Sequence, residues 1–168
     1  QTNRNSYSRQ ACAEKLVRDE NGDFLQSEMT SCGLNDGALK GEGIYEARIA
    51  CNLWSKEGTG RYDAGNPKKL LKEHPYITQD KKDGNESARQ YIANMRDGAV
   101  AGFKYFEITE PTSITVWLNG AGKGEMQVSD TADFRKSVHI PVEVDSKDTE
   151  SFQAELPEIY GKVALYFK

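Results

Sequence analysis

Histidine and cysteine, the side chains most used for metal binding and nucleophilic catalysis, are scarce in this chain of 168 residues. There are two histidines, His74 and His139, and three cysteines, Cys12, Cys32 and Cys51. The cysteines are odd in number and their spacing matches no paired zinc-binding pattern. His74 falls in a polar loop, His139 falls on the polar face of an expected strand, and neither has an evident Ser or Cys partner. Both are therefore expected to be solvated rather than catalytic.

An excess of positive charge and long apolar runs are also missing. The net charge is -4 and the pI is about 5.3. Nucleic acids and anionic membranes attract basic surfaces, so neither is an expected partner. No apolar run reaches the length of about 20 residues that a membrane-spanning helix needs. The chain also opens "QTNRNSYSRQ", without an initiator Met or an apolar leader, which predicts a processed start or a piece of a longer protein.

The cysteines leave two interpretations open. In the first, all three are buried thiols that act as small apolar side chains. In the second, Cys12 and Cys32 form a disulfide, because they flank the Asn21-Gly22 turn at nearly equal distances and paired strands would bring them together.

Most of the sequence has the pattern of β-strands. Short runs in which apolar and polar residues alternate are separated by Gly, Asn and Asp, as is typical of strands joined by turns. One short helix is expected at 67–74, where Pro67 can occupy the first turn. The expected strands are 8–17, 24–30, 44–54, a short one near "YITQ", 90–95, 99–108, 113–120, 124–129, 138–144, 151–156 and 161–167.

These strands predict an all-β protein, a jelly-roll β-sandwich in which two antiparallel sheets pack face to face. The alternation places Ile114 and Val116 on the core face of their strand and Trp117 on the other face. Pro141 indicates an edge strand or a bulge. The stretch 90–108 reads as one hairpin that turns at Asp97-Gly98.

Carboxylates are too numerous to identify a site, since there are 26 Asp and Glu and no spacing selects a catalytic pair. The stretches 79–86 and 145–150 are rich in side-chain oxygen, but neither has the Gly and Glu positions of the twelve-residue calcium loop. Solvated turns are the main interpretation of both stretches, and a structural calcium ion is the alternative.

Aromatic side chains are the remaining candidates for ligand binding. Sugar rings have flat C–H faces that stack on aromatic planes, whereas most aromatic residues of a small sandwich serve core packing. Tyr91 and Trp117 are the two that we single out as carbohydrate-binding residues. Tyr91 begins a strand after a long loop, and Trp117 lies opposite the core face of its strand.

Two parts of the sequence resemble known families. Residues 1–34, most specifically "SRQA" at 8–11 and "EMTS" at 28–31, resemble the final blade of the five-bladed propeller of glycoside hydrolase family 43. The segments "RIACNLW", "YIANMRDGAVAGFKYFEI", "VHIPVEV" and "FQAELPEIYGKVALYFK" resemble a carbohydrate-binding module of family 6, a β-sandwich often attached to such enzymes. The resemblance implies residues 1–43 as a blade remnant with a linker, and 44–168 as the module without its last strand.

The resemblance also implies a parent enzyme that removes xylose or arabinose from plant-wall polysaccharides, a xylosidase or arabinofuranosidase. The three catalytic carboxylates of that family lie in earlier blades, so no catalytic residue is expected here. Tyr91 matches one half of the usual sugar clamp, whereas Thr149 or a neighbour stands where the family has Trp. Cys51 replaces the Glu that commonly binds calcium.

Three functions follow as hypotheses. The first is an accessory domain that packs on the parent's own propeller, which we favour because half of the sugar clamp is missing. The second is a functional carbohydrate-binding module for xylan or arabinoxylan. The third, catalysis by this chain itself, has no residues to support it. The compartment is not indicated by the sequence.

Overall fold

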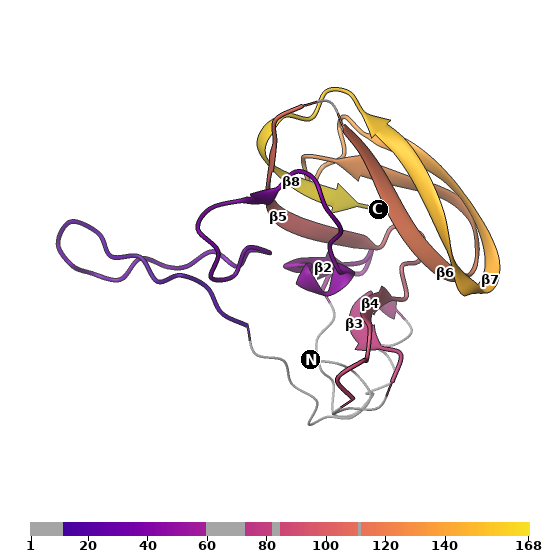
Figure 1. The fold of residues 1–168 in the computed structure, drawn as a ribbon, viewed down its shortest axis with the longest axis horizontal. Helices are drawn as coiled ribbons and strands as arrows, with labels where there is room; N and C mark the ends of the chain where they lie inside the picture. The colour runs from indigo at the N-terminus through magenta and orange to yellow at the C-terminus, as the bar shows by residue number, and fades with distance from the viewer. Residues whose placement is uncertain (1–11, 60–72, 82–84, 111) are drawn as a thin grey trace.

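The protein is all-β, as predicted, in a computed structural model that describes residues 12–59, 73–81, 85–110 and 112–168 (Figure 1). Part of the expected helix at 67–74 lies outside these residues. Within them there is one short 3₁₀ helix, η1 (Ala47–Ile49), and eight strands. The strands are β1 (Leu39–Lys40), β2 (Asn52–Trp54), β3 (Tyr76–Gln79), β4 (Gln90–Ala93), β5 (Val100–Ile108), β6 (Thr112–Ser129), β7 (Val138–Leu156) and β8 (Gly161–Phe167).

Six of these strands form one sheet in the order β1-β5-β8-β6-β7, with β2 also paired to β5. β8 lies between β5 and the end of β6, where Val128 is opposite Phe167. β3 and β4 form a separate antiparallel ribbon. Among the residues described, β7 pairs only with β6 and is an edge strand, which confirms the expectation drawn from Pro141.

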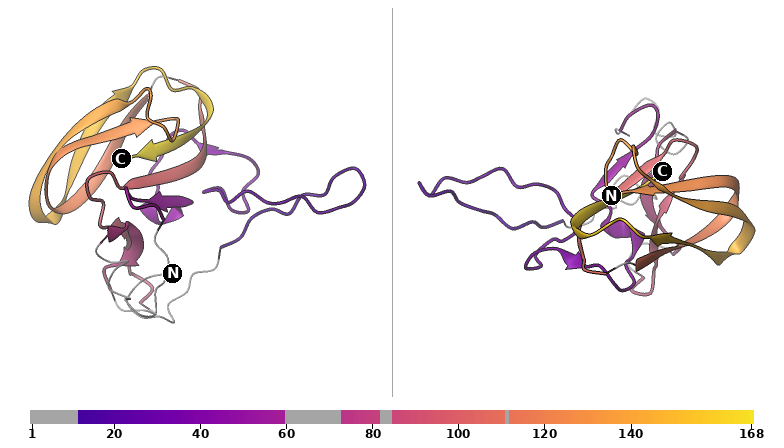
Figure 2. Two further views of the ribbon diagram at one scale, coloured as in Figure 1. Left: turned by 180° about the vertical axis from the view of Figure 1, so that it is seen from behind. Right: turned by 90° about the horizontal axis from the view of Figure 1, so that it is seen from above.

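The long β6–β7 hairpin makes the sheet curl over itself (Figures 1 and 2). Its register shifts between Leu118 and Gly120, and Gly120 has a φ of +115°, which favours glycine. Side chains from both halves of the hairpin meet those of β5 and β8 in one core. Its buried members include Phe106, Ile108, Val128, Ile140, Leu156, Ile159 and Leu165. The curled sheet therefore encloses its core between two layers, as a sandwich does.

The alternation of strand faces is confirmed where it was most regular. Ile114 and Val116 pack against the core, and Trp117 is exposed on the other side of β6. β8 is buried on both faces, because Leu165 enters this core while Ala164 and Tyr166 pack in a smaller cluster with Val100.

The hairpin predicted for 90–108 is wrong. β4 pairs with β3, with Tyr91 opposite Thr78. β5 cannot accept β4 because both of its edges are occupied, one by β8 and the other by β2 and β1. Between the two strands, Asn94 and Gly98 have φ angles of +62° and +75° and turn the chain away from a hairpin path.

Several predicted strand bounds also differ from the structure. The separate strands expected at 113–120 and 124–129 are one strand, β6, and those at 138–144 and 151–156 are joined in β7. Of the strand expected at 44–54, only β2 forms; η1 lies before it, because Ile49 and Ala50 donate local hydrogen bonds to Glu46 and Ala47 at 3.2 and 3.1 Å. The short strand near "YITQ" is confirmed as β3.

Residues 12–30, which we call the arm, project away from the sheet in all three views (Figures 1 and 2). The Asn21-Gly22 turn is confirmed, with Gly22 at a φ of +86°. In the described part of the arm, however, the ladder is reduced to one bridge between Arg18 and Phe24. Nearer the base, a side chain takes the place of a backbone partner: the Thr30 amide donates to the Glu14 carboxylate at 2.7 Å.

Candidate functional site

Trp117 and Tyr91, the two predicted binding residues, lie in different sheets. Trp117 is 54% exposed on the outer face of β6, directly opposite Ser151 of β7. Tyr91 is 41% exposed on β4, opposite Thr78 of β3. The two residues therefore lie on different strand pairs, Tyr91 on β3–β4 and Trp117 on β6–β7.

A polar pocket that sequence reasoning missed lies beside η1 and the end of the β3–β4 ribbon. It measures about 380 Å³ and is lined by Glu46, Arg48, Gln79, Asn85, Glu86, Ala88 and Gln90. Gln90 donates from Nε2 to Oε1 of Gln79 at 3.4 Å, and the Arg48 guanidinium pairs with the Glu46 carboxylate. These carboxylate, amide and guanidinium groups offer both donors and acceptors to a ligand rich in hydroxyl groups.

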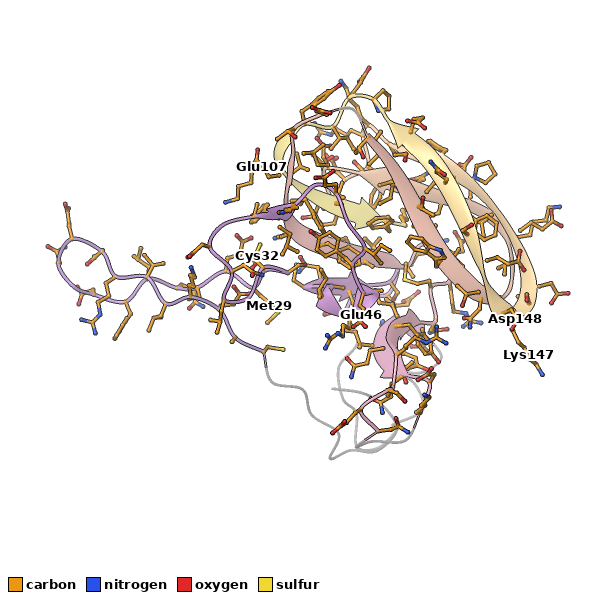
Figure 3. All side chains as sticks on the ribbon, in the orientation of Figure 1. Met29, Cys32, Glu46, Glu107, Lys147 and Asp148 are labelled. Carbon is orange, nitrogen blue, oxygen red and sulfur yellow. The ribbon has the colours of Figure 1, made fainter. Side chains whose placement is uncertain are left out.

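Tyr91 does not line this pocket. Gln90 and Tyr91 are consecutive residues of β4, and consecutive side chains of a strand point to opposite faces. The pocket takes Gln90, so the Tyr91 ring faces the other side of the ribbon. Glu46 is labelled in Figure 3 near the β3–β4 ribbon. No sequence pattern marked the pocket, because its residues come from three segments that only the fold brings together.

His74 is not the solvated histidine that was expected. It is 7% exposed, and its Nδ1 lies 2.9 Å from the Oγ of Ser55. Its carbonyl oxygen accepts a hydrogen bond from Nδ2 of Asn94 at 2.8 Å. A Ser–His pair can form a nucleophile, but Ser55 is itself 8% exposed, so a substrate has no access to its hydroxyl. The pair satisfies buried polar groups instead.

His139 is exposed on its strand, as predicted, but it also has a Ser neighbour that the sequence did not suggest. Its Nε2 lies 3.1 Å from the Oγ of Ser137, and its Nδ1 contacts the carboxylate of Glu125. The order Ser–His–Glu is that of a hydrolase triad. The side chains of His139 and Glu125 are nearly half exposed on the surface of a strand pair, where water competes for each hydrogen bond. We assign this cluster to the solvated surface.

The three cysteines are free thiols, so the Cys12–Cys32 disulfide is not formed. Cys12 is exposed, which also contradicts the interpretation of three buried thiols. The Sγ of Cys32 accepts a hydrogen bond from the amide of Tyr105 at 3.3 Å, on β5. Cys51 is half-buried, and burial raises the pKa of its thiol, which keeps it protonated and unreactive.

Metal binding has no preformed site in the described ranges, where no group of three or more His, Cys, Asp or Glu gathers. The calcium alternative for 79–86 includes residues outside these ranges. The turn expected at 145–150 is wrong, because these residues belong to β7, where Asp145 and Ser146 pair with β6. Lys147 and Asp148 point outward there (Figure 3). As for membranes, no helix among the described residues is long and apolar enough to span one.

The base of the arm is attached to β5 by a charged cluster. The Glu28 carboxylate accepts hydrogen bonds from Nζ of Lys104 at 2.9 Å and from the Tyr105 hydroxyl at 2.9 Å. These two hydrogen bonds lower the pKa of Glu28, and the same contacts raise the pKa of Lys104 and of Tyr105. The Nζ of Lys162 lies 4.8 Å from the centroid of the Tyr105 ring. Met29 and Cys32 mark this junction in Figure 3.

Beyond its base, the arm exposes apolar side chains on both of its faces. Leu16 and Val17 are consecutive in an extended segment, as are Phe24 and Leu25, so each pair points to opposite sides. These four residues are 49–62% exposed, and Met29 is 62% exposed. Four large apolar side chains exposed on so short a ribbon differ from scattered surface residues. The Arg18 guanidinium, 4.5 Å from the centroid of the Phe24 ring, is a charged group that contacts one of them.

Comparison with known proteins finds similarity to part of a glycosidase. No model of a known protein family matches it. A curated xylosidase/arabinosidase from Thermoclostridium stercorarium is 43% identical over 166 residues, which are 99% of this chain and 34% of that protein. The chain is thus homologous to part of that protein and spans about a third of its length.

A solved structure has a similar fold. It is a glycoside hydrolase family 43 arabinoxylan arabinofuranohydrolase from Bacillus subtilis, in complex with cellotetraose. The likeness has a TM-score of 0.52 and covers 92% of this chain and 29% of that one, at 15% identity. At this identity the comparison concerns the fold alone.

Proposed function

We propose that this chain is a non-catalytic accessory part of a glycoside hydrolase that degrades xylan or arabinan, and that it packs on the catalytic part of the same polypeptide. Its homology to about a third of a xylosidase/arabinosidase supports a part rather than a whole enzyme. In this proposal residues 1–43 extend a propeller blade of the catalytic part, and 44–168 form the attached sandwich.

The observation that carries the proposal is the arm. Its apolar side chains on both faces, Leu16 and Phe24 among them, would be covered if the ribbon were inserted into a larger sheet structure. Burying an apolar side chain of this size contributes about 1.5–3 kcal/mol. The cluster of Glu28, Lys104 and Tyr105 then holds the sandwich close to the surface that receives the arm.

A reassociation experiment tests this role. The chain is mixed with the remainder of the T. stercorarium relative, made without its matching third, and binding is measured by calorimetry. We expect binding that Leu16→Asp with Phe24→Asp abolishes, because charges at these positions cannot be buried unpaired. Ile44→Asp is the matched control, since Ile44 is exposed on the sandwich rather than on the arm.

Enzyme activity in the same mixtures gives a second measurement. The chain alone should release no xylose or arabinose from aryl glycosides, and its release of either sugar would refute the non-catalytic role. If the two parts do not reassociate, the same substitutions are made in a fusion of the chain to that remainder. There the double substitution should lower the Tm and Ile44→Asp should not; equal effects would contradict docking through the arm.

Carbohydrate binding is the second candidate function, and the polar pocket favours it. Its volume is that of a small-molecule site, and its amides and carboxylates suit sugar hydroxyl groups. The structurally similar arabinofuranohydrolase was crystallised with an oligosaccharide. Calorimetry with xylohexaose and arabinoxylan tests this function, using Asn85→Ala for the pocket and Tyr91→Ala for the opposite face. Binding that either substitution abolishes would put this function ahead of the docking role.

A further inference from the structure

The sequence contains two Asn-Gly pairs, and the structure places them in different surroundings. Asn21-Gly22 forms the tip of the arm, away from the sheet (Figure 1), whereas Asn119-Gly120 lies within β6. A glycine nitrogen has no side chain beside it, so it can approach the side-chain carbonyl of the preceding Asn closely. Any other residue after Asn hinders this approach with its own side chain. The two pairs are therefore the candidates for a reaction between an Asn side chain and its own backbone.

Asn119 is held in place by the β6–β7 hairpin. The residues on either side of it in β6, Leu118 and Gly120, are both paired with β7. Its Nδ2 also donates to the carbonyl oxygen of Lys147 at 3.5 Å. Movement of the backbone at this point requires the long hairpin to open, and side chains from both of its strands pack in the core. The free energy of local opening at Asn119 is therefore high.

Asn21 is held by its turn alone. It is exposed, and its side-chain amide has no hydrogen-bond partner among the described residues. The Gly22 amide donates to the carbonyl oxygen of Asp19 at 3.1 Å. The Oδ1 of the same aspartate accepts from the amides of Asn21 and Asp23, both at 2.9 Å. None of residues 19–23 belongs to a buried cluster. Opening the tip therefore breaks only a few exposed hydrogen bonds and costs little.

We propose that Asn21 is a site of spontaneous deamidation, which converts it to aspartate and isoaspartate. Hydroxide removes the amide proton of Gly22, and the nitrogen then attacks Cγ of Asn21. A new N–Cγ bond forms, and the side-chain nitrogen leaves as ammonia, which gives a cyclic succinimide. Water adds to either carbonyl carbon and opens the ring. The net change is the uptake of one water molecule and the release of one ammonia, without an oxidant or a reductant.

The products change both the charge and the backbone of the tip. A carboxylate at position 21 joins Asp19, Glu20 and Asp23, which already make the turn acidic, so the like charges repel. In isoaspartate the main chain runs through the former side chain and is one methylene longer. The turn hydrogen bonds to Asp19 then no longer fit, and the two strands of the arm lose their register. We therefore expect deamidation to weaken the docking of the arm, a consequence that rests on the proposed function.

Peptide mapping by mass spectrometry measures both Asn-Gly pairs in the same molecule. The chain is held at mildly alkaline pH, and the aspartate and isoaspartate formed at positions 21 and 119 are followed with time. We expect Asn21 to react at least about tenfold faster than Asn119, because the local opening that exposes it costs less. Asp19→Ala removes the carboxylate that holds the turn, and it should speed the reaction at Asn21 but not at Asn119. Equal rates at the two sites, or a faster reaction at Asn119, would overturn the proposal.

Docking is measured separately, with fresh and aged chains and the remainder of the T. stercorarium relative. The aged chain should lose most of its affinity. Asn21→Ser keeps a side chain that suits a turn but cannot form the succinimide, so this variant should bind equally well before and after ageing. Asn119→Ser is the matched control and should lose affinity on ageing as the unmodified chain does.

The outcomes separate the modification from the docking role. An aged chain that binds as well as the fresh chain, although Asn21 has reacted, would refute the expected effect on docking. A fresh chain that does not bind would instead contradict the docking role, and the reaction rates at Asn21 and Asn119 would still decide whether the tip of the arm is the modification site.

Discussion

Close packing around single residues sets the tightest limits in this fold, and Gly102 of β5 is the clearest case. A Cβ atom at this position would lie 2.8 Å from two ring carbons of Tyr166 and 3.2 Å from the Cβ of Asn52. Tyr166 is buried, so its ring has little room to move. Side chains from both strands that flank β5, Tyr166 of β8 and Asn52 of β2, therefore leave room only for glycine at this position.

Gly102→Ala should accordingly destabilise the protein by about 1–3 kcal/mol, the usual cost of overpacking. The free energy of unfolding in urea measures the effect. Gly122→Ala is the control, because Gly122 is a strand glycine whose Cβ would meet nothing within 4 Å. Similar unfolding midpoints for the two variants would contradict the steric account.

The contact of Glu28 with Lys104 and Tyr105 makes the attachment of the arm depend on pH. The pKa of Glu28 is lowered by its hydrogen bonds, so its contribution is present above the ordinary value of 4.5 and is lost as the pH falls through the lowered value. The pKa values of Lys104 and Tyr105 are raised by the same carboxylate. Their contributions are present below the ordinary values of 10.5 and 10.0 and are lost as the pH rises through the raised values.

We therefore expect the base of the arm to be ordered around neutral pH and to loosen at both extremes. Backbone NMR relaxation of residues 28–32 measures this ordering during a titration. Glu28→Gln should loosen the base already at neutral pH and remove most of the acid transition. An acid transition that persists unchanged in Glu28→Gln would show that other carboxylates control it.

The sequence predicted the exposure of single residues well where it depends only on the alternation of apolar and polar residues along one strand. Trp117 is exposed and Ile114 is inward because β6 is regular there. His74 was misjudged because its burial depends on Ser55 and Asn94, which are distant in sequence. The polar pocket was missed for the same reason.

The connection between β4 and β5 helps to decide which strand β4 pairs with. Asn94 has a φ of +62°, which Asn tolerates better than most residues, and its side-chain amide binds the His74 carbonyl at 2.8 Å. The residue thereby joins the β3–β4 ribbon to the loop before β3.

Substitution of Asn94 separates these two roles. Asn94→Gly keeps the backbone angle but loses the hydrogen bond, and we expect a loss of about 0.5–1.5 kcal/mol. Asn94→Ala loses the hydrogen bond and also strains the backbone, which adds about 1 kcal/mol or more. Thermal or urea unfolding gives both values. An Ala variant as stable as the Gly variant would show that the backbone angle is not needed.

Strand lengths were the least predictable property of the elements. The residues of 119–124, "NGAGKG", have turn composition, and the sequence therefore predicted a break between two strands. The structure continues β6 through them, since each of Gly120, Gly122 and Gly124 is paired with β7 and the positive φ of Gly120 absorbs the bulge. Glycine marks both turns and bulges, and only the pairing partner distinguishes them.

For the molecule as a whole, the all-β class and its enclosed core followed from the sequence because strand alternation recurs along the chain. The pairing order did not, because it depends on which strand occupies each edge of β5. The isolated chain shows a compact curled sheet and an arm with little packing of its own (Figure 2). A binding partner would change this contrast, because it would give the arm the packing that it lacks in the isolated chain.

The arm should make the isolated chain associate with itself and bind apolar dyes. Leu16, Val17, Phe24 and Leu25 are large apolar side chains exposed close together on one short ribbon, and such surfaces promote aggregation when uncovered. We expect Leu16→Asp with Phe24→Asp to lower the fluorescence of bound anilinonaphthalene sulfonate and the scattering of concentrated solutions. The unfolding free energy should stay nearly unchanged, because neither side chain packs on the sandwich core.

Ile44→Asp again serves as the control, since it removes an exposed apolar residue from outside the arm. If it lowers dye binding as much as the double substitution does, the apolar surface of the chain is diffuse and the arm is not a specific docking element. If the double variant instead unfolds more easily, the arm already packs against the sandwich in solution. The expected result is that the unmodified chain associates with itself, whereas the double variant is monomeric and equally stable. That result would identify the arm as a surface that requires a partner.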